Sequence, residues 1–130
     1  MDAEPTPRNF PRRVLIVDDK AIVSGFLVDL LSDAGYRVDT APDGWTALDK
    51  VEAGTYDVIL SDVDMPGLDG PRLYEELTRR HPHLRGRFVL LAGNIERETV
   101  RAFVERTAVP CLAKPFNIEA VLSAIRGLTG

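Results

Sequence analysis

The segment "SDVDMPGLDG", residues 61–70, carries three aspartates within ten positions, directly after an apolar run. Asp69 precedes "GPRLYEEL", which has a helical pattern with Pro71 in its first turn, so we predict that Asp69 is the N-cap of that helix. Asp62 and Asp64 are then the two aspartates whose chemistry has to be explained.

Two further carboxylates and one lysine follow other apolar runs. Asp18 and Asp19 come after "VLIV", and Lys114 comes after "CLA". If Asp18, Asp19 and Asp62 lie together, they repel one another and raise each other's pKa unless a cation sits among them, and Lys114 offsets only part of their charge. Hard oxygen ligands, few of them from protein, suit Mg²⁺, which keeps bound water and leaves room for a phosphoryl oxygen. These residue types therefore predict a Mg²⁺ site.

The segments that must position these residues alternate between two patterns. The runs "VLIV", "YRV", "DVILS", "FVLLA" and "PCLA" have the pattern of strands, and the longer segments between them have helical periodicity. Segment 20–34 shows the helical pattern, and Gly35 is placed to end it. The stripe predicted to face a sheet consists of Val23, Phe26, Leu27, Leu30, Leu31 and Ala34.

Strands 14–17, 57–60 and 88–91 are apolar without alternation, as parallel strands covered by helices on both faces require. Five βα units with right-handed crossovers predict an α/β fold, a doubly wound parallel sheet. Ligands bind such sheets at the carboxyl ends of the strands. The candidate site residues all fall there, and they are Asp18, Asp19, Asp62, Ala92, Gly93 and Lys114.

A simpler interpretation exists for each polar residue taken alone. An aspartate after a strand is usually the N-cap of the next helix, and a lysine is usually solvated. The pair Asp18 and Asp19 weakens that interpretation, because a cap needs one carboxylate.

Composition limits the classes of partner. A net charge of −4, with basic residues scattered among acidic ones, argues against direct binding to nucleic acid. The one cysteine, Cys111, cannot form an internal disulfide, and we recognise no signal peptide or membrane-spanning run. We therefore expect a cytoplasmic protein that contacts no membrane directly. The proline-rich residues 1–12 are expected to be a flexible leader before one domain, 13–130.

Three motifs together carry a family resemblance. "VLIVDD", "DVILSDVDMPGLDG" and "LAKPF", in this order and at these spacings, resemble the receiver domain of two-component response regulators. The similarity extends over nearly the whole chain after the leader, including "GYRVDTAPDGWTALDKV". Each motif is weak by itself, but the ordered set is specific. The resemblance implies a flavodoxin-like fold, a five-stranded parallel sheet of order 2-1-3-4-5 with five helices.

The resemblance also implies a role for each site residue. Asp62 would be the phosphoacceptor, and it would share Mg²⁺ with Asp18 and Asp19, of which Asp19 is the likelier direct ligand. Asp64 would lend its backbone carbonyl to the metal and direct its side chain to the site entrance, and Lys114 would pair with the phosphoryl group. Such a protein is no conventional enzyme, because it phosphorylates itself once and then slowly loses the phosphate.

The implied partner is a histidine kinase or a histidine phosphotransfer protein. Its histidine-bearing helix would dock beside the first helix, over Ala21, Ile22 and Gly25. The family usually has a cis lysine–proline bond, so we expect Lys114–Pro115 to be cis. Both a single-domain regulator and the receiver of a hybrid sensor histidine kinase fit these motifs.

The sequence departs from the family at two positions. Ala92 stands where the fourth strand normally ends in Ser or Thr, and Cys111 stands where an aromatic switch residue is usual. Gly93 leaves the following loop permissive, and Asn94 is the nearest polar side chain. We therefore expect an atypical switch, with a phosphate relay or sink favoured over a conventional output.

Two other functions remain open at this point. A pseudo-receiver would bind partners without phosphorylation, although the complete set of Asp18, Asp19, Asp62 and Lys114 argues against it. "LSDVD" also resembles the D-x-D motif of haloacid-dehalogenase-like phosphatases. That motif normally lies on the first strand with an acidic pair near the end of the chain, the reverse of the order here.

Overall fold

The computed structural model describes residues 12–129. The leader predicted over 1–12 lies outside the described residues, apart from Arg12. None of the helices in the described part has both the length and the apolarity that a membrane crossing needs.

Strands and helices alternate along the chain, as the sequence pattern predicts. The elements are β1 (Arg13–Val17), α2 (Ala21–Asp33), β2 (Arg37–Ala41), α3 (Gly44–Ala53), β3 (Val58–Asp62), α4 (Gly70–Arg80), the 3₁₀ helix η1 (Pro82–Gly86), β4 (Phe88–Ala92), α5 (Glu98–Thr107), β5 (Cys111–Ala113) and α6 (Ile118–Thr129). The strands form one sheet of order β2-β1-β3-β4-β5, and every neighbouring pair is parallel. The predicted fold class, a flavodoxin-like doubly wound sheet, is confirmed.

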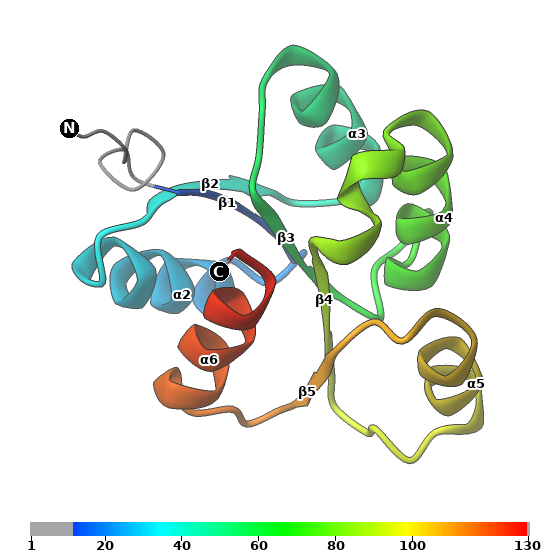
Figure 1. Ribbon diagram of the computed structural model, residues 1–130. Helices are drawn as coiled ribbons and strands as arrows, with labels where there is room; N and C mark the ends of the chain where they lie inside the picture. The colour runs from blue at the N-terminus through cyan, green and yellow to red at the C-terminus, as the bar shows by residue number, and fades with distance from the viewer. Residues whose placement is uncertain (1–11, 130) are drawn as a thin grey trace, which may run out of the picture.

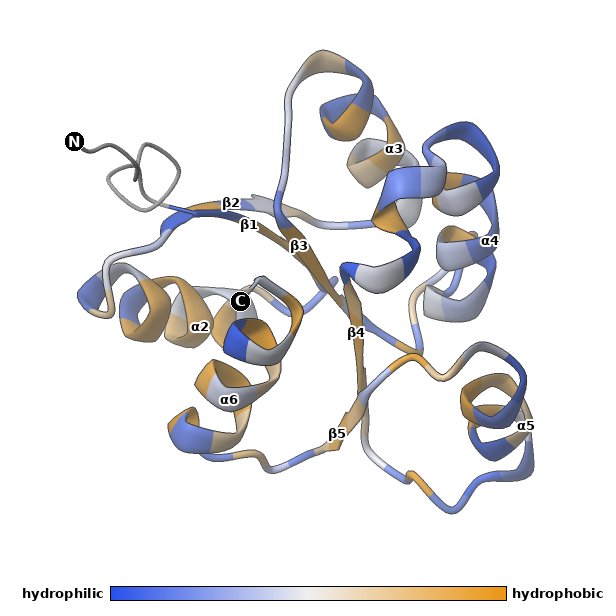
Figure 2. Cartoon of the chain, viewed as in Figure 1, coloured by the Kyte–Doolittle hydropathy of each residue, from blue (hydrophilic) through white to orange (hydrophobic). Residues whose placement is uncertain are grey.

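The helices cover the sheet in two layers (Figure 1). Alternate strand residues point to opposite faces, so β1 sends Val14 and Ile16 to one core and Leu15 and Val17 to the other. Helices α2 and α6 pack on the first face, and α3, α4 and α5 pack on the second. The central strands are mostly hydrophobic, whereas α4 and α5 carry hydrophilic residues on their outer faces (Figure 2). A sheet buried on both sides therefore holds its strand ends at fixed positions.

The face predicted for α2 is partly wrong. Leu27 and Leu31 are buried as expected, but Phe26 is 52% exposed and Ala34 is exposed. Ser24, which is not in the predicted stripe, is buried. The helix has more apolar positions than one face of the sheet can cover, so hydropathy alone could not select the buried stripe. The predicted end is confirmed, because Gly35 follows the helix with φ of +97°.

Candidate functional site

The carboxyl ends of three strands bring together the residues that the sequence singled out. Asp18 follows β1, Asp62 is the last residue of β3, and Lys114 follows β5. The ammonium Nζ of Lys114 lies 3.0 Å from Asp62 Oδ1 and 3.6 Å from Asp18 Oδ2. Both carboxylates are buried. The lysine therefore joins two acidic strand ends across the intervening β4.

Three carboxylates converge beside this lysine. Oxygen atoms of Asp18, Asp19 and Asp62 all lie within 4.8 Å of one another. Asp19 is the exposed member. The side chain of Asp64 is exposed and does not join the cluster. The acidic cluster thus has a buried side and a side open to solvent.

Asp18 has an unusual environment. Its Oδ1 accepts a hydrogen bond of 2.8 Å from the backbone N–H of Lys20, but its buried Oδ2 has no hydrogen-bond partner among residues 12–129. Burial raises the pKa of the Asp18 carboxyl, and the charge of Asp62 adds to that rise, while the Lys20 hydrogen bond and Lys114 oppose it. A divalent cation would give this oxygen a direct partner in addition to the Lys114 ammonium at 3.6 Å, and it would relieve the repulsion among the carboxylates. The all-oxygen donor set fits Mg²⁺.

The backbone around Asp62 is tightly held. Val63 donates a hydrogen bond of 2.9 Å to the carbonyl of Leu91, and Gly70 donates one of 3.0 Å to the carbonyl of Val63. Gly70 also lies so close that a Cβ there would stand 2.5 Å from the carbonyl oxygen of Asp62. Only glycine allows the start of α4 to approach the end of β3 this closely.

The start of α4 has the cap that its sequence predicts. The side chain of Asp69 accepts a hydrogen bond of 2.9 Å from the backbone N–H of Arg72, and Pro71 lies in the first turn. Asp69 is therefore a structural residue. Of the three aspartates in segment 61–70, Asp62 alone joins the acidic cluster through its side chain.

The sequence did not predict the ion pair between Arg97 and Asp64, which lies beside the acidic cluster. Arg97 donates two hydrogen bonds to the Asp64 carboxylate, from Nη1 to Oδ2 at 3.2 Å and from Nη2 to Oδ1 at 3.0 Å. Its Nε also donates to Thr99 Oγ1 at 3.2 Å. This pair links the loop after β3 to the start of α5. The two residues are far apart in the chain, and no motif connects them.

Lys20 is a second residue that sequence reasoning missed. Its Nζ lies 3.3 Å from Asp19 Oδ1 and 3.6 Å from Asp62 Oδ2. Contact with Asp19 and then the charge of Asp62 raise the pKa of Lys20. The signal available in the sequence was its position, directly after the Asp18–Asp19 pair.

The two positions at which the sequence departs from the family lie at the end of β4 and at the start of β5. Ala92 is buried at the end of β4, and its carbonyl accepts a hydrogen bond of 2.8 Å from the backbone N–H of Lys114. Asn94 is exposed, and its Oδ1 accepts a hydrogen bond of 2.9 Å from the backbone N–H of Glu96 in a local turn. Cys111 is half-buried beneath α5, and burial raises the pKa of its thiol. The Lys114–Pro115 bond is cis, as expected.

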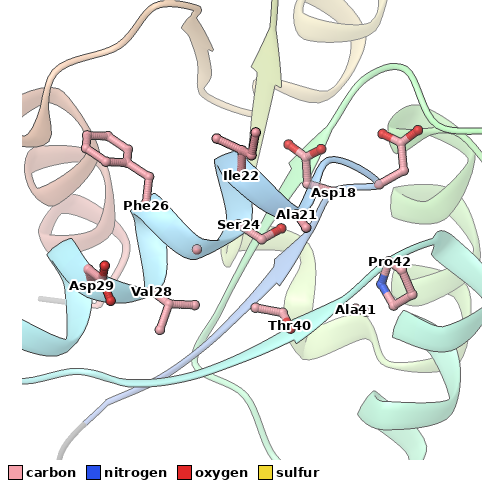
Figure 3. Close-up of a pocket in the computed structure, with 12 residues that line it drawn as sticks. Asp18, Ala21, Ile22, Ser24, Phe26, Val28, Asp29, Thr40, Ala41 and Pro42 are labelled. Atoms are coloured by element: carbon pink, nitrogen blue, oxygen red, sulfur yellow. The ribbon is translucent and has the colours of Figure 1, made fainter.

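The proposed docking residues lie on the open side of α2. Ile22 is 88% exposed, and Ala21 and Gly25 are exposed beside it. Figure 3 shows Ile22 next to Asp18 at the beginning of the helix. Ile22 and Phe26 also line a largely apolar hollow with Pro115 and Phe116. An exposed apolar surface therefore adjoins the acidic cluster.

Comparison with known proteins agrees with this geometry. Residues 14–126 match the family model described as the response regulator receiver domain. The sensor kinase CckA of Brucella abortus is 33% identical over 115 residues, which cover 87% of this chain and 12% of that protein. The curated relatives that it matches include longer proteins such as the sensor histidine kinase RcsC of Salmonella typhi and the transcriptional regulatory protein TcrA of Mycobacterium tuberculosis, of which this chain spans 11% and 46%.

Solved structures match nearly the whole fold. The chemotaxis protein CheY4 of Vibrio cholerae is 30% identical, with a TM-score of 0.82 over 91% of this chain and 98% of that one. The response regulator TrrA of Thermotoga maritima, solved in complex with Mg²⁺ and BeF, is 28% identical, with a TM-score of 0.78 over 90% of this chain and 98% of that one.

Proposed function

Because the chain belongs to the response regulator receiver domain family of two-component signalling, we propose that its Asp62 accepts a phosphoryl group from a phosphohistidine. The observation that carries this proposal is the position of Asp62 at a strand end, between the carboxylates of Asp18 and Asp19 and the ammonium of Lys114. A histidine kinase or a histidine phosphotransfer protein would be the donor.

The transfer needs little from the protein beyond placement and charge. An oxygen of Asp62 attacks phosphorus in line with the leaving imidazole, so a P–O bond forms as the P–N bond breaks and the electron pair returns to the ring nitrogen. Lys114, 3.0 Å from Asp62 Oδ1, can follow the charge onto a phosphoryl oxygen. The acyl phosphate formed on Asp62 is later hydrolysed, which restores the carboxylate.

The acidic cluster would hold Mg²⁺. Asp18, Asp19 and Asp62 offer carboxylate oxygens, Asp64 offers its backbone carbonyl, and the orphaned Oδ2 of Asp18 supports a cation there. Bound Mg²⁺ would neutralise charge on the transferring phosphoryl group. The complex of the relative TrrA with Mg²⁺ and BeF supports the same assignment.

We also propose a cytoplasmic receiver domain over 13–130 with an atypical output. Ala92 offers no hydroxyl to a phosphoryl oxygen, and Cys111 is too small to act as the aromatic that normally follows it inward. The side-chain oxygen of the nearby Asn94 accepts a hydrogen bond from the backbone N–H of Glu96 in a local turn. Phosphorylation should therefore couple weakly to α5, β5 and α6, as suits a relay or sink.

Stoichiometry with a P–N donor tests the function. With phosphoramidate and Mg²⁺, the wild-type protein should take up at most one phosphoryl group per chain, and Asp62→Ala should take up none. Neither protein should release phosphate repeatedly from a monoester such as p-nitrophenyl phosphate. Sustained monoester turnover would favour the phosphatase, and no uptake by the wild-type protein would favour the pseudo-receiver.

A further inference from the structure

The Asp62 carboxylate lies between two lysines, one near each oxygen. Lys114 Nζ is 3.0 Å from Oδ1, and Lys20 Nζ is 3.6 Å from Oδ2. Lys20 also lies 3.3 Å from Asp19 Oδ1. Lys114 therefore bridges the buried pair Asp18 and Asp62, whereas Lys20 bridges the outer pair Asp19 and Asp62.

The outer pair contains two of the carboxylates that would hold a divalent cation. An ammonium between Asp19 and Asp62 and a metal ion bound to the same two oxygens exclude each other, by charge and by volume. Lys114 does not compete in this way, because it reaches Asp62 through the other oxygen, from the β5 side. The side chain of Lys20 is 57% exposed, so its flexible stem can swing into solvent when a metal binds.

We propose that Lys20 is a tethered counter-ion that competes with the divalent cation for Asp19 and Asp62 and thereby sets the Mg²⁺ concentration at which Asp62 can be phosphorylated. While Lys20 contacts Asp62, both oxygens of the acceptor are paired with lysines. A metal ion that displaces Lys20 would take the place of this ion pair at Oδ2. The link to phosphorylation rests on the proposed function, whereas the competition itself does not.

The expected size of the effect is moderate. Ion pairs of partly exposed side chains are weak, so a competitor of this kind lowers metal affinity severalfold rather than by orders of magnitude. We expect Lys20→Met to bind Mg²⁺ roughly three- to tenfold more tightly than the wild-type protein. Methionine keeps an unbranched stem, and the backbone N–H of residue 20 can still donate to Asp18 Oδ1.

The chain offers a matched control, since Lys50 on α3 is the one lysine of the sequence besides Lys20 and Lys114. Lys50→Met changes the net charge equally but lies away from the acidic cluster, so it should alter Mg²⁺ affinity less than twofold, through long-range charge alone. Lys20→Arg keeps the cation and should bind Mg²⁺ no more tightly than the wild-type protein. Circular dichroism should show the same fold in all four proteins.

Calorimetric titration with Mg²⁺ alone, at fixed ionic strength and pH 7, is the test. Tighter binding by Lys20→Met and not by Lys50→Met supports the proposal. Equal or weaker binding by Lys20→Met, an equal gain in Lys50→Met, or no Mg²⁺ binding by any variant overturns it. The titration contains no phosphodonor, so its result stands even if Asp62 is never phosphorylated.

A second readout connects the competition to the proposed function. The Mg²⁺ concentration for half-maximal phosphorylation by acetyl phosphate should fall in Lys20→Met by the same factor as the dissociation constant. An unchanged half-maximal concentration beside tighter Mg²⁺ binding would remove Lys20 from control of phosphorylation. A complete lack of phosphorylation in the wild-type protein would count against the proposed function alone.

Discussion

The metal-binding role proposed for Asp18 conflicts with its contribution to stability. The side chain is fully buried, and its Oδ2 has no hydrogen-bond partner within the described chain. Burial raises the pKa of the carboxyl, so the folded protein binds a proton there more tightly than the unfolded chain does. At pH values above the unfolded pKa of about 3.9, the ionised form therefore lowers the free energy of unfolding.

Asp18→Asn should consequently stabilise the protein while weakening its metal site. In EDTA at pH 7 we expect the free energy of unfolding to rise by about 1 kcal/mol, because a buried charge is removed. The gain should disappear as the pH falls below about 4, where the wild-type carboxyl is itself protonated. Urea unfolding across this pH range measures both effects.

The exposed Asp29, on α2, provides the control. Asp29→Asn should change the free energy of unfolding by less than about 0.5 kcal/mol. Destabilisation by Asp18→Asn at pH 7, with Mg²⁺ affinity unchanged, would contradict the role assigned to Asp18.

The beginning of α4 fixes the end of β3. A Cβ on Gly70 would stand 2.5 Å from the carbonyl oxygen of Asp62 and 2.8 Å from Leu90 Cδ1, and neither the backbone nor the buried leucine can move freely. Gly70→Ala should therefore lower the free energy of unfolding by about 2 kcal/mol and slow phosphorylation, because Asp62 has to shift.

Gly127 in α6 is the matched glycine, since a Cβ there would meet nothing within 4 Å. Gly127→Ala should stabilise the protein by up to about 1 kcal/mol through helix propensity, without affecting phosphorylation. Thermal or urea unfolding of the two variants measures the difference. A Gly70→Ala protein as stable and as reactive as Gly127→Ala would show that the close approach has no importance.

The exposed side of α2 should distinguish protein donors from small ones. Ile22 is 88% exposed beside the acidic cluster, so Ile22→Asp should leave stability unchanged and remove an apolar anchor. We expect transfer from a phosphorylated histidine partner to slow by about tenfold or more, while phosphorylation by acetyl phosphate stays within twofold. Rapid-quench measurement of both reactions gives the ratio.

Ile95 is the control for this change, because it is another exposed isoleucine, in the loop before α5. Ile95→Asp should spare both reactions. If Ile22→Asp slows both donors equally, the substitution has damaged the acceptor site instead of a docking surface.

The sequence predicted elements better than it predicted faces and long-range contacts. Local apolar runs located all five strands to within a few residues. The match is best for the central strands, because a strand buried on both faces needs an uninterrupted apolar run, whereas the edge strand β2 contains Asp39 and Thr40 and extends three residues beyond the predicted run. Hydropathy could not orient α2, where Phe26 is exposed and Ser24 is buried. The contact between Arg97 and Asp64 was not predicted, because the two residues approach each other only in the folded protein.

The largest-scale question is how the proposed phosphoryl site at Asp62 communicates with α5, β5 and α6. A hydrogen bond to a charged group contributes about 1.5–3 kcal/mol, so without a hydroxyl at position 92 the active conformation should be favoured roughly ten- to a hundredfold less. When beryllofluoride and Mg²⁺ are added as a mimic of the phosphoryl group, the NMR chemical-shift changes of the backbone amides in residues 95–128 should be small in the wild-type protein.

Ala92→Thr supplies the missing hydroxyl at the end of β4 and should enlarge these shifts. Ala92→Val is the control of similar size without a hydroxyl, and its spectrum should change as little as that of the wild-type protein. Large shifts across 95–128 in the wild-type protein would show that signalling does not depend on that group.

The most direct test of the account is the intact mass of the protein after incubation with acetyl phosphate. We predict that the wild-type protein gains one phosphoryl group with Mg²⁺ and none in EDTA, whereas folded Asp62→Ala gains none under either condition. Phosphorylation of Asp62→Ala at another residue, or full phosphorylation of the wild-type protein in EDTA, would contradict the assignment of Asp62 as a Mg²⁺-dependent phosphoacceptor.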